Sequence, residues 1–136
     1  RIGILPGWKI PDCQAEITAC VERAARTHPF LADNPPEVVW SGFLSPGYEV
    51  TGAQDSEAVL AAAYEEIFGG QLEEASFTGL TDTRFYGLDY DVPAFCFGAT
   101  MEGAHGFNER VDIESVKKVT KTLALFIAGW CGVEET

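Results

Sequence analysis

Apolar residues recur at intervals of three and four in three segments of the chain, the spacing of one face of an α-helix. These segments are residues 12–26, 55–68 and 113–131. Asp112 precedes the last helix, and either Asp55 or Ser56 begins the second, since short polar side chains favour helix starts. The last helix is the longest, and its apolar positions are Ile113, Val116, Val119, Leu123, Phe126, Ile127 and Trp130.

Short runs of apolar residues, or of residues that favour strands such as Val and Trp, lie between the helical segments and are typical of strands. These runs are residues 1–5, 38–40, 73–78 and 92–98. Residues 81–86 are ambiguous and predict one or two helical turns, and the glycine-rich residues 99–110 predict an irregular loop. Helices that alternate with strands indicate an α/β fold, with the helices packed against a sheet.

A break in the chain is predicted within residues 44–54, where Ser45-Pro46-Gly47 and Thr51-Gly52 interrupt any regular element. The sequence therefore predicts a small strand–helix–strand unit over residues 1–43. A second and larger unit is predicted over residues 44–136.

The charge of the chain limits its partners. Nine Lys and Arg against 21 Asp and Glu give a net charge of −12, which argues against nucleic acid and against anionic membranes. No signal peptide is recognisable, and the longest apolar run, residues 123–133, is too short to span a bilayer. We therefore expect a cytoplasmic protein whose four cysteines are reduced, small, buried side chains.

His105 and Arg84 are the candidates for chemistry. His105 lies in a loop bracketed by Gly103 and Gly106, just after a predicted buried strand, but no second metal-binding residue occurs at a recognisable spacing. Arg84 ends the polar run Thr81-Asp82-Thr83-Arg84. It is as suited to a structural salt bridge as to a substrate carboxylate, which its planar guanidinium matches. From the residues alone, a functional role and a structural role stay open for both His105 and Arg84.

Other polar residues favour structural roles. His28 lies beside a proline at a helix end, where an imidazole complements the helix dipole. Glu65 and Glu66 are adjacent on a helix and point about 100° apart, so they form part of a solvated face. Dinucleotide-binding, serine-hydrolase and P-loop motifs do not occur in the sequence.

Three segments in order resemble the closing motifs of the dinuclear-zinc amidohydrolases. This family includes acetylornithine deacetylase, succinyl-diaminopimelate desuccinylase, aminoacylase and carboxypeptidase G. The segments carry a Thr-Asp-x-Arg element in residues 79–85, a Val-Pro-Ala strand in residues 91–98 and an Ala-His loop with Asn-Glu in residues 104–111. Residues 1–7 and the helix after them resemble the later part of the family's lid domain.

The resemblance implies an α/β fold built from parts of two domains. Residues 1–43 would be the C-terminal part of an α+β, ferredoxin-like lid and dimerisation domain. Residues 44–136 would be the C-terminal part of a three-layer, zinc-peptidase-like catalytic domain. The chain would then begin inside the lid. Its missing N-terminal half would carry the other metal ligands and the general base, so this chain alone would be inactive.

The resemblance also assigns roles to particular residues. His105 matches a metal ligand, and Arg84 matches the arginine that holds the substrate carboxylate. Asn108 and Glu109 would support the histidine loop, whereas Thr81 and Gly98 would line the substrate pocket. Leu80 departs from the small or polar residue usual before Thr-Asp, which leaves the acyl specificity open.

The full-length enzyme implied by the resemblance would bind two zinc ions per subunit, with cobalt or manganese as alternatives. It would form a homodimer through the lid and cleave the amide bond of N-acyl amino acids or small peptides. The competing hypothesis is a non-catalytic binding or oligomerisation module with the same fold and without metals.

Overall fold

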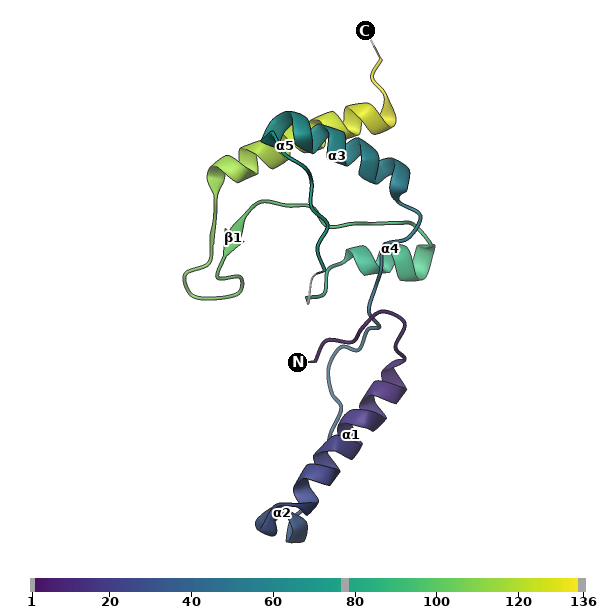
Figure 1. Cartoon of the computed structure of the whole chain (residues 1–136), viewed down its shortest axis with the longest axis vertical. Coiled ribbons are helices and arrows are strands. Elements are labelled where there is room, and N and C mark those ends of the chain that lie inside the picture. The colour runs from purple at the N-terminus through teal and green to yellow at the C-terminus, as the bar shows by residue number, and fades with distance from the viewer. Residues whose placement is uncertain (1, 77–78, 135–136) are drawn as a thin grey trace. The chain divides into compact units, whose positions relative to one another are not determined.

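The computed structural model describes residues 2–76 and 79–134 and divides the chain into two compact units, Arg1–Glu49 and Val50–Thr136 (Figure 1). The division falls within the proline- and glycine-rich segment that the sequence marks as a break. About half of the chain is helical, and the described residues contain little sheet.

The first unit contains the helices α1 (Ile10–Arg26) and α2 (Pro29–Asp33). Asp12 lies in the first turn of α1 and Arg26 in its last, so each charge complements the helix dipole. His28 is the N-cap of α2, because its imidazole Nδ1 accepts a hydrogen bond from the Leu31 amide at 3.4 Å. The structural interpretation of His28 is therefore supported, although this histidine begins a helix rather than complementing the end of one.

The strands predicted at either end of the first unit do not form. Residues 2–5 and 38–40 are not strands, and one isolated parallel bridge joins Pro6 to Gly47. A β-carbon at position 47 would lie 2.5 Å from the Pro6 nitrogen, so only glycine permits this close approach of two backbones. Residue 1, which also belongs to a predicted strand, lies outside the described residues.

The second unit is built on the packing of α3 (Gln54–Phe68) against α5 (Ile113–Cys131). Leu60 and Ala63 of α3 are buried, and Thr122 of α5 is fully buried. A β-carbon at Gly129 would lie 3.0 Å from Val59 Cγ1, so α5 comes very close to α3 at this glycine. The three predicted amphipathic helices are thus confirmed as α1, α3 and α5.

The ends of these helices test the predicted caps. Asp112 caps α5 as predicted, with its Oδ1 accepting a hydrogen bond from the Ser115 amide at 2.7 Å. Gly69 ends α3 in the left-handed conformation at φ 77°, which glycine adopts more easily than any other residue at a helix end. The predicted cap of α3 is wrong, because Ala53 holds that position and the Ser56 hydroxyl instead donates to the Ala53 carbonyl at 2.9 Å.

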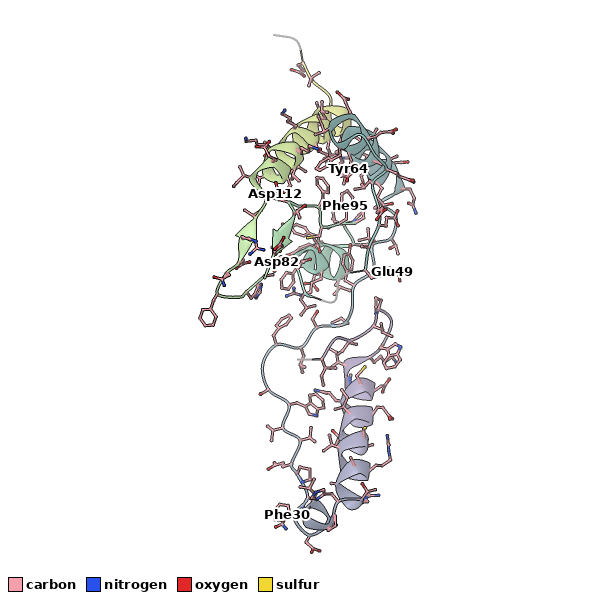
Figure 2. All side chains as sticks on the ribbon, turned by 60° about the vertical axis from the view of Figure 1, so that its left-hand side comes forward. Phe30, Glu49, Tyr64, Asp82, Phe95 and Asp112 are labelled. Atoms are coloured by element: carbon pink, nitrogen blue, oxygen red, sulfur yellow. The ribbon has the colours of Figure 1, made fainter. Side chains whose placement is uncertain are left out.

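The strands predicted in the second unit are also wrong where the structure describes them. Residues 73–76 and 92–98 do not form strands, and residues 77–78 lie outside the described part. The run 92–98 packs its rings on helices instead. The ring centroids of Phe95 and of Phe126 in α5 are 6.4 Å apart, and those of Phe97 and of Tyr64 in α3 are 6.1 Å apart. Figure 2 shows Tyr64 and Phe95 in this part of the unit.

The glycine-rich segment predicted to be irregular contains a short antiparallel hairpin. Strands β1 (Met101–Glu102) and β2 (Arg110–Val111) pair Met101 with Val111 and Glu102 with Arg110. The ambiguous residues before it begin the helix α4 (Thr83–Tyr90), whose eight residues make about two turns, as predicted, although it starts and ends later than residues 81–86.

Burial differs from expectation at the cysteines and on α5. The four cysteines are free thiols, as predicted, but Cys20, Cys96 and Cys131 are exposed and only Cys13 is buried. On α5 the side chain of Ile127 is 58% exposed and that of Trp130 is 54% exposed, so its apolar stripe is only partly covered. No helix in the described ranges has both the length and the apolar character to cross a membrane.

Candidate functional site

His105 lies in the loop between β1 and β2. Its φ of 64° places it in the left-handed region, which histidine enters more readily than most residues. Two backbone hydrogen bonds shape the loop: Gly106 N–H donates to the Gly103 carbonyl at 2.8 Å, and Glu109 N–H donates to the Gly106 carbonyl at 3.4 Å. The imidazole is exposed, and none of the described residues hydrogen-bonds it.

Asn108 and Glu109 share this loop and are also exposed. Below them, Glu102 and Arg110 form an ion pair across the two strands. The hairpin is further closed at its base, where Asp112 N–H donates to the Thr100 carbonyl at 3.0 Å. The backbone of the loop is therefore held by hydrogen bonds, whereas the side chains of its candidate residues face outward.

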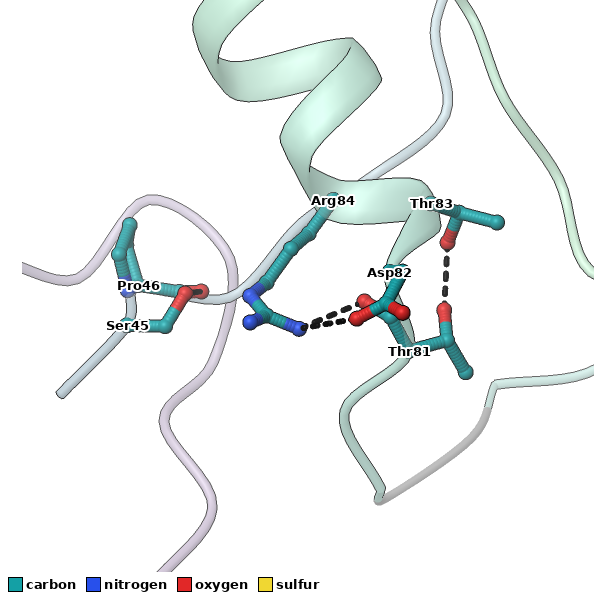
Figure 3. Close-up of polar contacts among 6 residues, drawn as sticks. All are labelled: Ser45, Pro46, Thr81, Asp82, Thr83 and Arg84. Carbon is teal, nitrogen blue, oxygen red and sulfur yellow. Dashed lines mark hydrogen bonds and ion pairs between the residues drawn. The ribbon is translucent and has the colours of Figure 1, made fainter. Parts of the chain in front are cut away.

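Arg84 lies in the first turn of α4 and is only 9% exposed (Figure 3). Its Nη1 donates to the Thr81 carbonyl at 2.7 Å and lies 3.9 Å from Asp82 Oδ1. The guanidinium also lies over the Phe85 ring, with Cζ 4.1 Å from the ring centroid. Asp82 is itself exposed, so water screens the ion pair and the carbonyl contact is the stronger of the two.

Thr81 belongs to the same cluster. Its hydroxyl lies 2.5 Å from the Thr83 hydroxyl, and its carbonyl holds the Arg84 guanidinium (Figure 3). The polar run identified in the sequence is therefore one hydrogen-bonded group at the start of α4. This geometry accommodates both the structural and the substrate-binding interpretation of Arg84.

Gly98 lines an open cavity of about 480 Å³ in the second unit, together with Thr100 and Ser115 at the base of the hairpin. The cavity lies beside the stacked rings of Tyr64 and Phe68, whose centroids are 4.3 Å apart. Neither His105 nor Arg84 lines it. The sequence candidates therefore occupy three places: the hairpin loop, the start of α4, and this cavity.

The hairpin loop can supply one ligand of a zinc site, because the imidazole of His105 is exposed and has no hydrogen bond to the described residues that would occupy its nitrogens. A complete site needs about three or four protein ligands. Within residues 2–76 and 79–134, no three His, Cys, Asp or Glu side chains come together in a way that could hold a metal ion. The described part of this chain thus offers a ligand but not a full metal centre.

Comparison with known proteins assigns the chain to a family of hydrolases. The profile of peptidase family M20/M25/M40 matches residues 9–129. Because this match covers most of the chain, the protein belongs to that family. The match supports the α/β class in general terms, while the details of a lid domain stay a prediction.

Among similar proteins is the N-formyl-4-amino-5-aminomethyl-2-methylpyrimidine deformylase of Halalkalibacterium halodurans, which is 24% identical over 125 residues. The aligned region covers 85% of this chain and 29% of the deformylase. The chain thus spans less than a third of that relative's length. The relative's printed name, like the family's, describes cleavage at an acyl–nitrogen bond.

Sequence reasoning missed Ser115. Its hydroxyl links the two ends of the hairpin to α5, accepting from Thr100 N–H at 2.9 Å and donating to the Asp112 carbonyl at 2.7 Å. The spacing Asp112-x-x-Ser115 is that of a helix cap and its third residue. That spacing signals the cap, but only the structure reveals the contact with Thr100.

Proposed function

We propose that this chain is the C-terminal portion of a metal-dependent hydrolase that cleaves the amide bond of N-acyl amino acids or small N-acyl compounds. The observation that carries the proposal is the exposed imidazole of His105 on a hydrogen-bonded hairpin, in a chain whose family is M20/M25/M40. Residues 1–43 would belong to the lid and residues 44–136 to the catalytic domain. The remaining ligands and the general base would come from the part of the protein that precedes this chain.

In this proposal His105 is a metal ligand, with zinc as the first candidate and cobalt or manganese as alternatives. When bound, such a metal polarises a carbonyl oxygen and lowers the pKa of bound water. His105 contributes an imidazole nitrogen as a ligand, and the hydrogen bond from Gly106 N–H to the Gly103 carbonyl fixes the backbone around it. Asn108 and Glu109 support the loop and hold polar groups beside the histidine.

Arg84 and Thr81 form the proposed carboxylate-binding group. A guanidinium has five N–H donors in one plane, and the bond from Nη1 to the Thr81 carbonyl fixes the orientation of that plane. A buried, oriented guanidinium pairs more strongly with a substrate carboxylate than an exposed one, because the local dielectric is lower. Arg84 would thereby set the position of the scissile amide.

The substrate is proposed as a small molecule with an acyl group on nitrogen. The family match and the deformylase named among the relatives both support this class. The acyl group is left open by Leu80, which departs from the usual residue before Thr-Asp. Gly98 would line the pocket for part of the substrate, and the full-length protein would be a homodimer joined through its lid.

The test uses the full-length protein and the variant His105→Ala. We expect purified full-length protein to bind two zinc ions per subunit and to hydrolyse at least one of N-formyl, N-acetyl or N-succinyl amino acids. His105→Ala should lower kcat/KM at least a hundredfold and weaken zinc binding. The 136-residue chain alone, supplied with zinc or cobalt, should show no turnover.

The control is His28→Ala, which removes the other histidine of the chain, a cap on α2. This variant should keep its zinc and its activity. Zinc binding and turnover that survive His105→Ala would refute the assignment of His105. Full-length protein that binds no zinc at all would favour the non-catalytic module.

A further inference from the structure

The hairpin that carries His105 is too small to hold its own position. Each of its strands has two residues, and an isolated two-stranded hairpin is at best marginally stable in water. The ion pair between Glu102 and Arg110 is exposed on both sides and adds little. Some other part of the chain must therefore fix the direction in which the hairpin leaves α5.

Ser115 makes the contacts that can do this. Its hydroxyl accepts a hydrogen bond from Thr100 N–H at 2.9 Å, directly before β1. The same hydroxyl donates to the Asp112 carbonyl at 2.7 Å, directly after β2. Thr100 and Asp112 are in turn joined by their own backbone hydrogen bond at 3.0 Å. One side chain thus ties both ends of the hairpin to the first turn of α5.

The helix that bears Ser115 is a suitable anchor. α5 has 19 residues and packs along α3, and its Thr122 is fully buried. A site is held most accurately when its supporting residues belong to a packed element. The hydroxyl of Ser115 therefore transmits the position of α5 to the hairpin and to the histidine in its loop.

We propose that Ser115 is a positioning residue that holds the His105 hairpin in the geometry needed for metal binding. The inference rests on the proposed function, because it requires His105 to be a ligand. Residues that orient a ligand without touching the metal typically change metal affinity by about 10–100-fold when they are removed. We expect an effect of this size from Ser115→Ala.

Ser115→Ala separates this role from helix capping. The cap itself is the hydrogen bond from Ser115 N–H to Asp112 Oδ1, which uses the backbone of Ser115 and survives the substitution. Thr120→Ala is the matched control on the same helix. It also removes a hydroxyl that bonds to the helix backbone, but that hydroxyl donates to the Val116 carbonyl within α5 and bonds to neither end of the hairpin.

The experiment measures Zn²⁺ affinity of the full-length protein by competition with a chelator, together with amide hydrogen exchange at Thr100. Ser115→Ala should weaken zinc about tenfold or more and speed exchange at Thr100. Ser115→Thr, which keeps the hydroxyl, should restore both, and Thr120→Ala should change neither. If Ser115→Ala does not fold, Ser115→Val takes its place, because it also lacks the hydroxyl and adds no zinc-binding thiol, and the same order of affinities is expected.

His105→Ala distinguishes the two ways in which the results can fail. Unchanged zinc affinity in His105→Ala would refute the proposed function itself. Weakened zinc in His105→Ala with normal zinc in Ser115→Ala would overturn the positioning role alone. An equal loss in Ser115→Ala and Thr120→Ala would also overturn it, because a general loosening of α5 would then explain the effect.

Discussion

Thr122 of α5 offers a direct test of what a buried hydroxyl costs in the second unit. It is the largest fully buried side chain among the described residues, and its hydroxyl has no hydrogen-bond partner there. Burying a hydroxyl without a partner costs about 1–3 kcal/mol relative to leaving it in water. Valine has nearly the same shape and a similar helix propensity, so Thr122→Val removes the unsatisfied group without leaving a void.

We expect Thr122→Val to raise the free energy of unfolding by about 1–2 kcal/mol. Thr122→Ser keeps the unsatisfied hydroxyl and deletes a buried methyl, so it should destabilise by about 1 kcal/mol. The assay is amide hydrogen exchange along α5 in the full-length protein, where Thr122→Val should slow exchange about 5–30-fold.

The control is Thr120→Val, which lies on the same helix but is exposed and has its hydroxyl bonded to the Val116 carbonyl. It should be neutral or slightly destabilising. Faster exchange in Thr122→Val would refute the reasoning, since it would mean that the hydroxyl is satisfied in the native protein. An equal gain from Thr120→Val would show that helix propensity, and not burial, controls the result.

Three further predictions concern separate parts of the chain. Gly47→Ala should destabilise the first unit by about 1–3 kcal/mol, because its β-carbon would lie 2.5 Å from a backbone atom; Gly3→Ala, with nothing within 4 Å, is the control in the same thermal melts. His105→Gly and His105→Ala should both lose zinc. The glycine variant should be the more stable of the two by about 1 kcal/mol, because the φ of 64° at this position suits glycine better than alanine. Equal free energies of unfolding in urea titrations would contradict this. Arg84→Lys should lower kcat/KM about tenfold or more for substrates with a carboxylate and leave kcat/KM for neutral amides unchanged. An equal loss of kcat/KM on both kinds of substrate would indicate a structural role for Arg84.

The helices could be predicted from the sequence because their pattern is local. A stripe at three and four residues, as in 113–131, is completed within one segment, and Asp112 and Gly69 mark ends that need no distant partner. Strands could not be predicted in this way, because a strand exists only beside another. Residues 92–98 have the composition of a buried strand, yet their rings pack on α3 and α5 instead.

The sequence singles out His105 and Arg84 as candidates but does not predict the contacts that hold them. His105 follows from its glycine-bracketed loop and from the family motif, and Arg84 follows from the polar run before it. The contacts of Arg84 with Thr81, and of Ser115 with Thr100, depend on how the backbone turns at each place. The sequence contains no sign of the Ser115–Thr100 contact, which joins residues 15 positions apart.

The exposed cysteines affect how any metal experiment on this protein should be designed. Thiolates bind zinc readily, and Cys20, Cys96 and Cys131 are all accessible to solvent. A raw zinc titration would therefore count adventitious thiol binding together with any binding through His105. Replacing the three exposed cysteines with serine in every variant removes this background. Because exposed positions tolerate such changes within about 0.5 kcal/mol, the substituted protein is a sound parent for the whole series.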